Sequence, residues 1–145
     1  MNMNSTDSNL GFLLADVSRL MRRQFQKRLE GNTLTFAQAR VLLHLSRSPG
    51  MRQVELAEIL EMQPISLIRV IDPLQEQGLL ERRADPTDRR AYQLFLTPAA
   101  TPHLQAIKSV ADSLRGDVLG SLSEQETVIL HDVLNRLRTK LSSQT

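Results

Sequence analysis

Four arginines and two aspartates lie around a single proline in the stretch ERRADPTDRRAYQLFLT, residues 81–97. Arg82 and Arg83 precede the proline, and Arg89 and Arg90 follow it. A guanidinium group binds phosphates and the acceptor atoms of base edges, so arginines at this density favour a nucleic-acid partner. A solvated run of surface charges is the alternative, because such runs are common and their ion pairs contribute little.

The arginines are expected to lie on a β-hairpin. Two short segments of strand-forming residues, 79–83 and 92–96, flank a turn-rich connection that Pro86 stiffens. Arg89 and Arg90 then project from the hairpin tip, where an arginine can enter the strong negative potential of a narrow minor groove. The hairpin is therefore one half of a predicted DNA-binding site.

Other charged residues of the hairpin are expected to support these contacts. Asp88 lies two residues before Arg90, and its carboxylate is expected to hold the Arg90 guanidinium in place. Arg82 and Arg83 lie at the base of the hairpin, where we expect them near DNA phosphates.

A helix before the hairpin is expected to supply the other half of the site. It begins at Gln63-Pro64, because proline is tolerated in a first helical turn, and it ends at Gly78. A helical wheel turns one apolar arc towards the core: Pro64, Leu67, Ile68, Ile71 and Leu74. The opposite arc holds Ile65, Ser66, Arg69, Pro73 and Glu76. In a major groove, arginine can bind guanine, serine a base or a phosphate, and isoleucine a thymine methyl group.

The rest of the chain predicts a mainly α fold that positions these two elements. Apolar residues at three- and four-residue spacing predict a first helix over 10–31. Thr35 and Gln38 form a capping-box pattern that opens a second helix to about Ser46, and residues 53–60 predict a third. The second to fourth helices and the hairpin form a winged helix-turn-helix with a two-stranded β wing.

Two more helices follow the hairpin and are expected to dimerise the chain. Thr97-Pro98 begins the fifth helix, and a capping box from Ser123 to Glu126 begins the sixth. Together with the first helix, they carry longer apolar stripes than a small central domain can cover. We therefore expect a second copy of the chain to cover these long N- and C-terminal helices.

Composition is consistent with one intracellular domain. The 145 residues are 41% apolar, enough for a single core, and they include no cysteine, which excludes disulfides and thiol chemistry. No window is long and apolar enough to span a membrane, so a cytoplasmic protein is expected. The predicted domain has dimerisation helices at 10–31 and 98–142 and a DNA-binding part at 35–97.

Two other function classes were weighed against DNA binding. The chain has no nucleophile motif or phosphate loop, and its three histidines, His44, His103 and His131, fall on three helices without metal-ligand spacing. We therefore predict no enzyme, no cofactor and no metal site. Residues 48–97 are net acidic although the chain carries a net charge of +2, which keeps open a winged helix that binds only protein.

The hairpin resembles the wing of the MarR family of bacterial winged-helix regulators. Every specified position of the family's wing pattern D-x-R-x-x-x-L-x-L-T is matched, by Asp88, Arg90, Leu94, Leu96 and Thr97. Residues 55–57 and 74–82 resemble the family's second helix-turn-helix signature and strand entry. Residues 63–69 are similar to the SlyA-like branch.

The resemblance implies an obligate homodimer on a pseudo-palindromic operator, with the fourth helix in the major groove of double-stranded DNA and Arg90 in the flanking minor groove. It also implies release from DNA by a small phenolic or anionic effector bound between the dimerisation and DNA-binding parts. We expect that pocket where the first helix meets the second, near Arg19, Met21, Arg22, Phe36 and His44. If His44 does not line the pocket, it is expected to be a hydrogen-bonded core residue.

Two positions depart from the family pattern. The glycine often found between the third and fourth helices is absent, because residues 60–63 read Leu-Glu-Met-Gln. Pro73 lies inside the predicted recognition helix, where it removes a backbone hydrogen bond and clashes with the carbonyl of Arg69. We expect a bend there.

Overall fold

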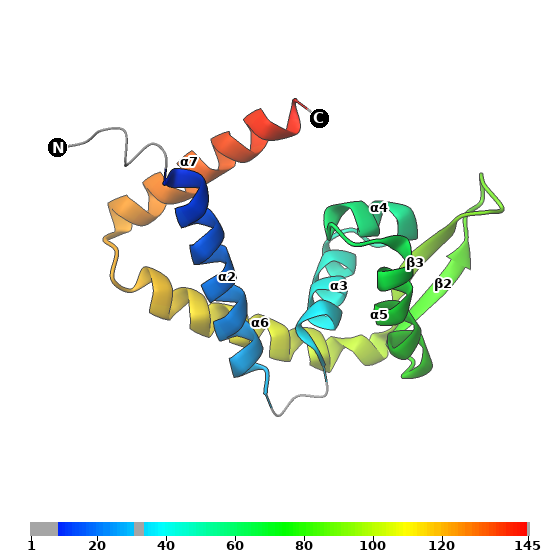
Figure 1. Cartoon of the computed structure of the whole chain (residues 1–145). Coiled ribbons are helices and arrows are strands. Elements are labelled where there is room, and N and C mark those ends of the chain that lie inside the picture. Colours follow the sequence, from blue (N-terminus) through cyan, green and yellow to red (C-terminus); the bar gives the residue numbers. More distant parts are fainter. Residues whose placement is uncertain (1–8, 31–33, 145) are drawn as a thin grey trace. The chain divides into compact units, whose positions relative to one another are not determined.

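The computed structural model describes residues 9–30 and 34–144, and these residues form a mainly α fold with a small antiparallel sheet, as predicted (Figure 1). The elements are α2 Leu10–Arg28, α3 Phe36–Arg47, β1 Met51–Arg52, α4 Gln53–Ile59, α5 Pro64–Glu76, β2 Leu80–Ala84, β3 Tyr92–Leu96, the 3₁₀-helix η1 Pro98–Ala100, α6 Thr101–Leu119 and α7 Glu124–Ser142. The chain divides into two compact units, Met1–Val110 and Ala111–Thr145. The first unit contains the helix-turn-helix and its wing.

The core of the first unit lies between helices α3, α4 and α5 and the small sheet. Leucine, isoleucine and valine at helical spacing turn one stripe of each helix inward. The largest fully covered side chains are Val41, Leu42, Leu45, Leu56, Leu67, Ile71, Leu74, Leu80, Leu94 and Ile107. Burying a side chain of this size contributes roughly 1.5–3 kcal/mol. This shared core holds α5 and the wing strands in one packed frame.

Two capping boxes begin helices at the predicted residues. At α3, the Gln38 N–H donates to Thr35 Oγ1 at 3.2 Å, and the Thr35 N–H donates to Gln38 Oε1 at 3.0 Å. At α7, Ser123 and Glu126 make the same reciprocal pair. Each box satisfies amides that the first helical turn leaves without partners, which is why the sequence pattern located both helix starts.

Two helix boundaries differ from the prediction. The last helical residue of α2 is Arg28, and the predicted end at Gly31 and Asn32 lies outside the described residues. Thr97 does not cap α6 with its side chain, because its hydroxyl donates to the Gly78 carbonyl at 2.5 Å. The chain instead passes through η1 before α6 begins. Thr97 thus ties the end of β3 to the turn that follows α5.

The sheet has one strand more than predicted. Strand β3 is central, with β2 and β1 antiparallel on either side of it. Gly50, at a φ of 81° that favours glycine, turns the chain into β1. β1 then pairs Met51 with Leu94 and Arg52 with Gln93. Two residues are too few to show an alternating pattern, so the sequence does not reveal this strand.

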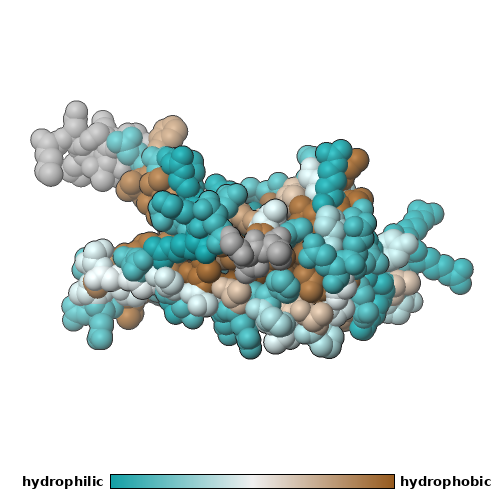
Figure 2. All heavy atoms as spheres, turned by 90° about the horizontal axis from the view of Figure 1, so that it is seen from below, coloured by the Kyte–Doolittle hydropathy of each residue, from teal (hydrophilic) through white to brown (hydrophobic). Residues whose placement is uncertain are grey.

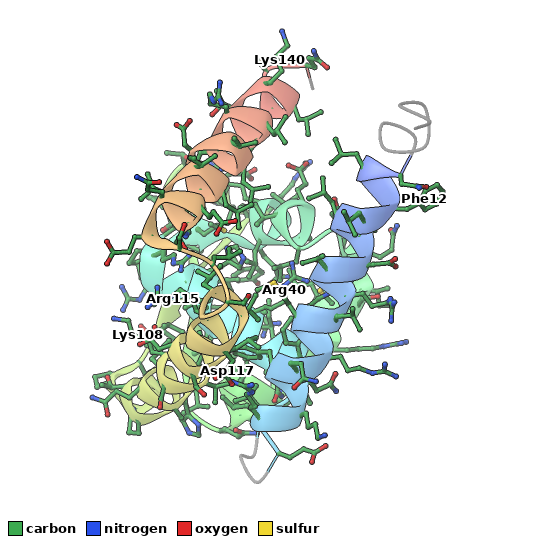
Figure 3. All side chains as sticks on the ribbon, turned by 90° about the vertical axis from the view of Figure 1, so that its left-hand side faces the viewer. Phe12, Arg40, Lys108, Arg115, Asp117 and Lys140 are labelled. Carbon is green, nitrogen blue, oxygen red and sulfur yellow. The ribbon has the colours of Figure 1, made fainter. Side chains whose placement is uncertain are left out.

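Apolar side chains stay exposed on the outer helices. No residue of α2 or α7 is buried. The exposed apolar residues of α2 are Leu10, Phe12, Leu13, Leu14, Val17, Leu20 and Met21, and those of α7 are Val128, Ile129, Leu130, Leu134, Leu137 and Leu141. Figure 2 shows hydrophobic atoms on the surface, and Figure 3 shows Phe12 near the start of α2. No described helix is long and apolar enough to cross a membrane.

Candidate nucleic-acid interface

Helix α5 buries one face and presents the other. Leu67, Ile71 and Leu74 are fully covered by the core. Ile65 is 61% exposed, and Arg69 is exposed beside it without an ion pair to any described residue. Proline at the first helical position and Gln63 before it start the helix where the sequence predicts. The outward face therefore offers a guanidinium and an aliphatic group, as the wheel predicts.

The prediction that Pro64 and Ile68 face the core is wrong, since both lie on the surface. Val70, on the other flank of the buried stripe, packs against the core instead. The buried arc is thus turned towards Val70. As a result, Ile68 lies with Ile65 and Arg69 on the outward face of α5.

The other residues of the predicted outward arc differ in their exposure. Ser66 and Pro73 are half-buried, and Glu76 is exposed. Pro73 does not end the helix, which continues to Glu76. The bend expected at Pro73 stays a prediction.

Most of the Arg82 side chain is covered at the base of the wing, and its predicted role near phosphates stays a prediction. Its side chain is 18% exposed, and its Nη2 lies 2.7 Å from Oδ1 of Asp72 on α5. Its Nε donates to Gln53 Oε1 on α4 at 3.1 Å, and its Nη1 donates to Gln75 on α5. Three of the five N–H groups of this guanidinium therefore have partners within the chain. Arg82 thus joins the wing to both helices.

Arg83 lies on the exposed side of the same strand. Its guanidinium carbon is 4.0 Å from the centre of the Phe95 ring, and it pairs with Glu81. Its side chain is still 57% exposed. A phosphate can therefore approach Arg83 while the aromatic ring holds the guanidinium in position.

The wing tip presents Arg89 and Arg90, both exposed and without an ion pair to any described residue. Asp88 does not hold the Arg90 guanidinium as predicted, because its Oδ1 accepts the backbone N–H of Arg90 at 2.9 Å. The Asp88 carboxylate therefore orders the backbone of the turn and not the Arg90 guanidinium. The Arg90 guanidinium stays open to a partner.

Asp85 is the residue that the sequence reading missed. Its side chain is 3% exposed, and its Oδ2 accepts the Arg52 Nε at 2.8 Å. Its Oδ1 accepts the Thr87 hydroxyl at 2.6 Å, the Thr87 N–H at 2.8 Å and the Asp88 N–H at 3.2 Å. The hydroxyl and N–H of Thr87, with help from Arg52, lower the pKa of Asp85 to about 2 against the opposing effect of burial.

These bonds fix the shape of the wing loop. Asp85 followed by Thr87 is an Asx-turn pattern, and this pattern is the signal that could have identified Asp85. The partner Arg52 lies on the unexpected strand β1, 33 residues away in sequence. The loop is thereby tied to the sheet as well as to itself.

A cleft of about 320 Å³ lies between the wing loop and the helix-turn-helix. Arg52, Arg90 and Tyr92 line one side of it, and Val54 and Pro64 line the other. The cleft joins the exposed start of α5 to the wing tip. The two halves of the predicted site thus form one continuous surface of the first unit.

A second cleft, of about 630 Å³, lies between α2, α3 and α4. It is lined by Ser18, Arg22, Phe36, Arg40, Ile59, Leu60 and Glu61. Of the five residues predicted for an effector pocket, Arg22 and Phe36 line this cleft, whereas Arg19, Met21 and His44 do not. Arg40, labelled in Figure 3, lies with its guanidinium carbon 5.8 Å from the centre of the Phe36 ring. The cleft therefore combines an aromatic face with two guanidinium groups.

His44 is half-buried on α3, outside this cleft. Partial burial and the positive charges of Arg40 and Arg47 lower its pKa. Among the described residues, no group of three or more histidine, cysteine, aspartate or glutamate side chains could hold a metal ion.

Comparison with known proteins agrees with this geometry. A family model described as "MarR family" matches residues 32–91. The chain is similar to the crystal structure of MarR, with 28% identity, a TM-score of 0.84, and coverage of 93% of this chain and 92% of that one. It is also similar to the transcriptional regulator PA3341, with 38% identity, a TM-score of 0.81, and coverage of 92% and 98%.

A third similar structure is a cysteine-to-serine variant of MarR from E. coli complexed with operator DNA. It shares 25% identity with this chain at a TM-score of 0.77, over 94% of this chain and 99% of that one. The likeness thus extends over nearly the whole length of each protein, including the outer helices. This chain belongs to the MarR family, which is a family of transcription regulators and not of enzymes.

Proposed function

We propose that this chain is a sequence-specific DNA-binding regulator. The observation that carries the proposal is that Arg90 of the wing tip and Pro64 at the start of α5 line one cleft, and that Arg69 is exposed on the same helix. Arg82 joins that wing to α5, and Asp85 orders its loop. A site whose parts are already positioned loses little entropy when it binds DNA. A similar protein was solved with operator DNA, which supports the same partner here.

The proposed contacts follow from exposure and chemistry. Arg69 binds a base edge in the major groove, with Ile65 and Ser66 beside it. Arg89 and Arg90 enter the flanking minor groove, and Arg83 contacts a phosphate. Arg82 and Asp88 position these groups.

The active form is proposed to be a homodimer on a pseudo-palindromic operator. The uncovered apolar stripes of α2 and α7 support this, since a second copy of the chain would remove them from water. In this arrangement residues 10–31 and 98–142 dimerise the chain, and residues 35–97 bind DNA. The two half-sites are then centred about 10 bp apart, one helical turn.

A small aromatic or anionic effector is proposed to bind the cleft between α2, α3 and α4. Phe36 offers a ring for stacking, and Arg22 and Arg40 offer charge for a carboxylate or phenolate. The cleft joins a dimerisation helix to the DNA-binding helices. A ligand that prefers one arrangement of these helices therefore shifts the affinity for DNA.

Selection of bound fragments from random duplex DNA tests the function directly. The expected result is a recurrent pseudo-palindrome. Arg69→Ala should then lose about 1–3 kcal/mol of operator binding and relax the preference at one base pair of each half-site. Arg115→Ala, an exposed arginine on α6 paired with Asp112, is the matched control and should bind as the wild type does. Recovery of no duplex would favour the alternative, a winged helix that binds only protein.

A further inference from the structure

Helix α5 exposes two large aliphatic side chains, Ile65 at 61% and Ile68 at 37%, one turn apart. The helix already has a complete buried stripe, so neither isoleucine is needed for the core. The C5 methyl of thymine is the apolar group that the major-groove edge of a base pair presents to such a side chain. We propose that Ile65 and Ile68 read thymine methyl groups in each half-site, an inference that rests on the DNA-binding function proposed above.

The charges around the two isoleucines suit a polyanion. Residues 64–71 contain no acidic side chain, and Arg69 lies on the same face as both isoleucines. Asp72 is the first acidic group along the helix, and it is paired with Arg82 at 2.7 Å. The first two turns of α5 therefore present positive charge and apolar surface together, as a thymine-containing groove requires.

The spacing sets which thymines the pair can reach. Side chains three residues apart on a helix have Cβ atoms about 5–6 Å apart. Successive base pairs are separated by about 3.4 Å along the axis. Ile65 and Ile68 therefore reach methyl groups one or two base steps apart. Arg69, four residues after Ile65 and next to Ile68, is expected to bind a guanine beside these thymines.

Uracil substitution tests the proposal without changing the protein. Each thymine of the selected operator is replaced in turn by uracil, which removes only the C5 methyl group. Wild-type protein should lose about fourfold in affinity at two neighbouring positions in each half-site, as expected for one buried methyl-sized group. Ile65→Ala should bind the thymine and uracil duplexes equally at one of these positions, and Ile68→Ala at the other. Val128→Ala, which changes an aliphatic side chain 67% exposed on α7, should keep the wild-type discrimination.

The possible outcomes distinguish this inference from the DNA-binding function on which it rests. Tight operator binding that tolerates uracil at every position overturns thymine reading and leaves the DNA-binding function standing. Discrimination that persists in both alanine variants assigns the methyl contact to another residue, and this also overturns the inference. Failure to select any duplex instead overturns the proposed function itself.

Discussion

The guanidinium of Arg82 on the wing lies 2.7 Å from the carboxylate of Asp72 on α5, and it also donates to Gln53 on α4. One side chain thus connects the wing to both α5 and α4. Its position in an arginine-rich stretch suggests a phosphate ligand, yet its contacts make it an internal link. Arg82 therefore adds a polar link to the apolar core that holds the wing and α5 together.

Arg82→Ala should lower both stability and operator affinity. The loss in unfolding free energy should be about 1 kcal/mol, because Asp72 is half exposed and water can replace part of the lost interaction. Operator affinity should fall further than stability suggests, since the wing and α5 lose their common partner. Urea unfolding and a DNA titration measure the two effects.

Arg83→Ala is the matched control for Arg82, one residue along the same strand. Its side chain is 57% exposed and carries no contact to α4 or α5 among the described residues. It should leave stability near the wild-type value, weaken operator binding modestly and lower the salt dependence of binding. Equal losses of stability in the two variants would contradict the linking role of Arg82.

The pair shows what the sequence can and cannot predict. The strand-forming segments 79–83 and 92–96 around a turn-rich connection place both arginines on the wing, and apolar spacing predicts the helices that carry the site. Which arginine points inward depends on Asp72 and Gln53, which come from other elements and leave no local pattern. Ile68 was misplaced for the same reason, because the tertiary packing of α3 and the sheet decides which flank of an amphipathic helix is covered. Periodicity alone leaves that flank open.

Stability should depend on pH through Asp85. The pKa of this group is about 2 in the folded chain against its ordinary value of 3.8, so the carboxylate form stabilises the fold above pH 3.8. That contribution is lost as the pH falls from 3.8 towards 2. Asp85→Asn should therefore be less stable than the wild type at neutral pH, and the difference should shrink through this acid range. Chemical unfolding of both proteins at a series of pH values measures it.

Thr87→Val isolates the largest cause of that pKa shift. It removes the hydroxyl that donates to Asp85 at 2.6 Å and keeps a side chain of similar shape. The pKa of Asp85 should rise, and the acid-dependent part of the stability should decrease relative to the wild type. A pH dependence that is unchanged by both substitutions would show that other carboxylates govern the acid transition.

An aromatic anion should stabilise the protein and weaken operator binding. Salicylate at millimolar concentration is a suitable probe, because its ring and carboxylate match Phe36 and the two guanidinium groups of the α2–α3–α4 cleft. Arg22→Ala should reduce both responses, whereas Arg19→Ala, which lies outside the cleft and pairs with Asp16, should not. Melting temperature and DNA affinity are the two readouts. If salicylate changes neither of them, the proposed effector response is wrong.

The protein should be a dimer at micromolar concentration by light scattering. Leu137→Glu places a charge in the apolar stripe of α7, so it should shift the mass towards the monomer and weaken operator binding. Val128→Glu is the matched control, because Val128 is 67% exposed and lies on the opposite side of the same helix. If the wild type is a monomer, the proposed dimer and the proposed spacing of about 10 bp between half-sites are both wrong.

Asp88 and Arg90 should act together at the wing tip. Arg90→Ala should weaken binding to all sequences, lower the slope of affinity against salt by about one, and reduce the preference for narrow A·T-rich flanks. Asp88→Ala should reproduce part of this defect although it removes a negative charge near DNA. The reason is that the Arg90 backbone loses the acceptor that holds its N–H at 2.9 Å, so the turn must be ordered on binding. Asp88→Asn keeps an oxygen acceptor and should bind nearly as well as the wild type.

If Asp88→Ala instead tightens binding, the aspartate only repels phosphate and its positioning role is wrong. If neither Asp88→Ala nor Arg90→Ala changes affinity for any selected duplex while both abolish binding to a protein partner, the wing does not read DNA.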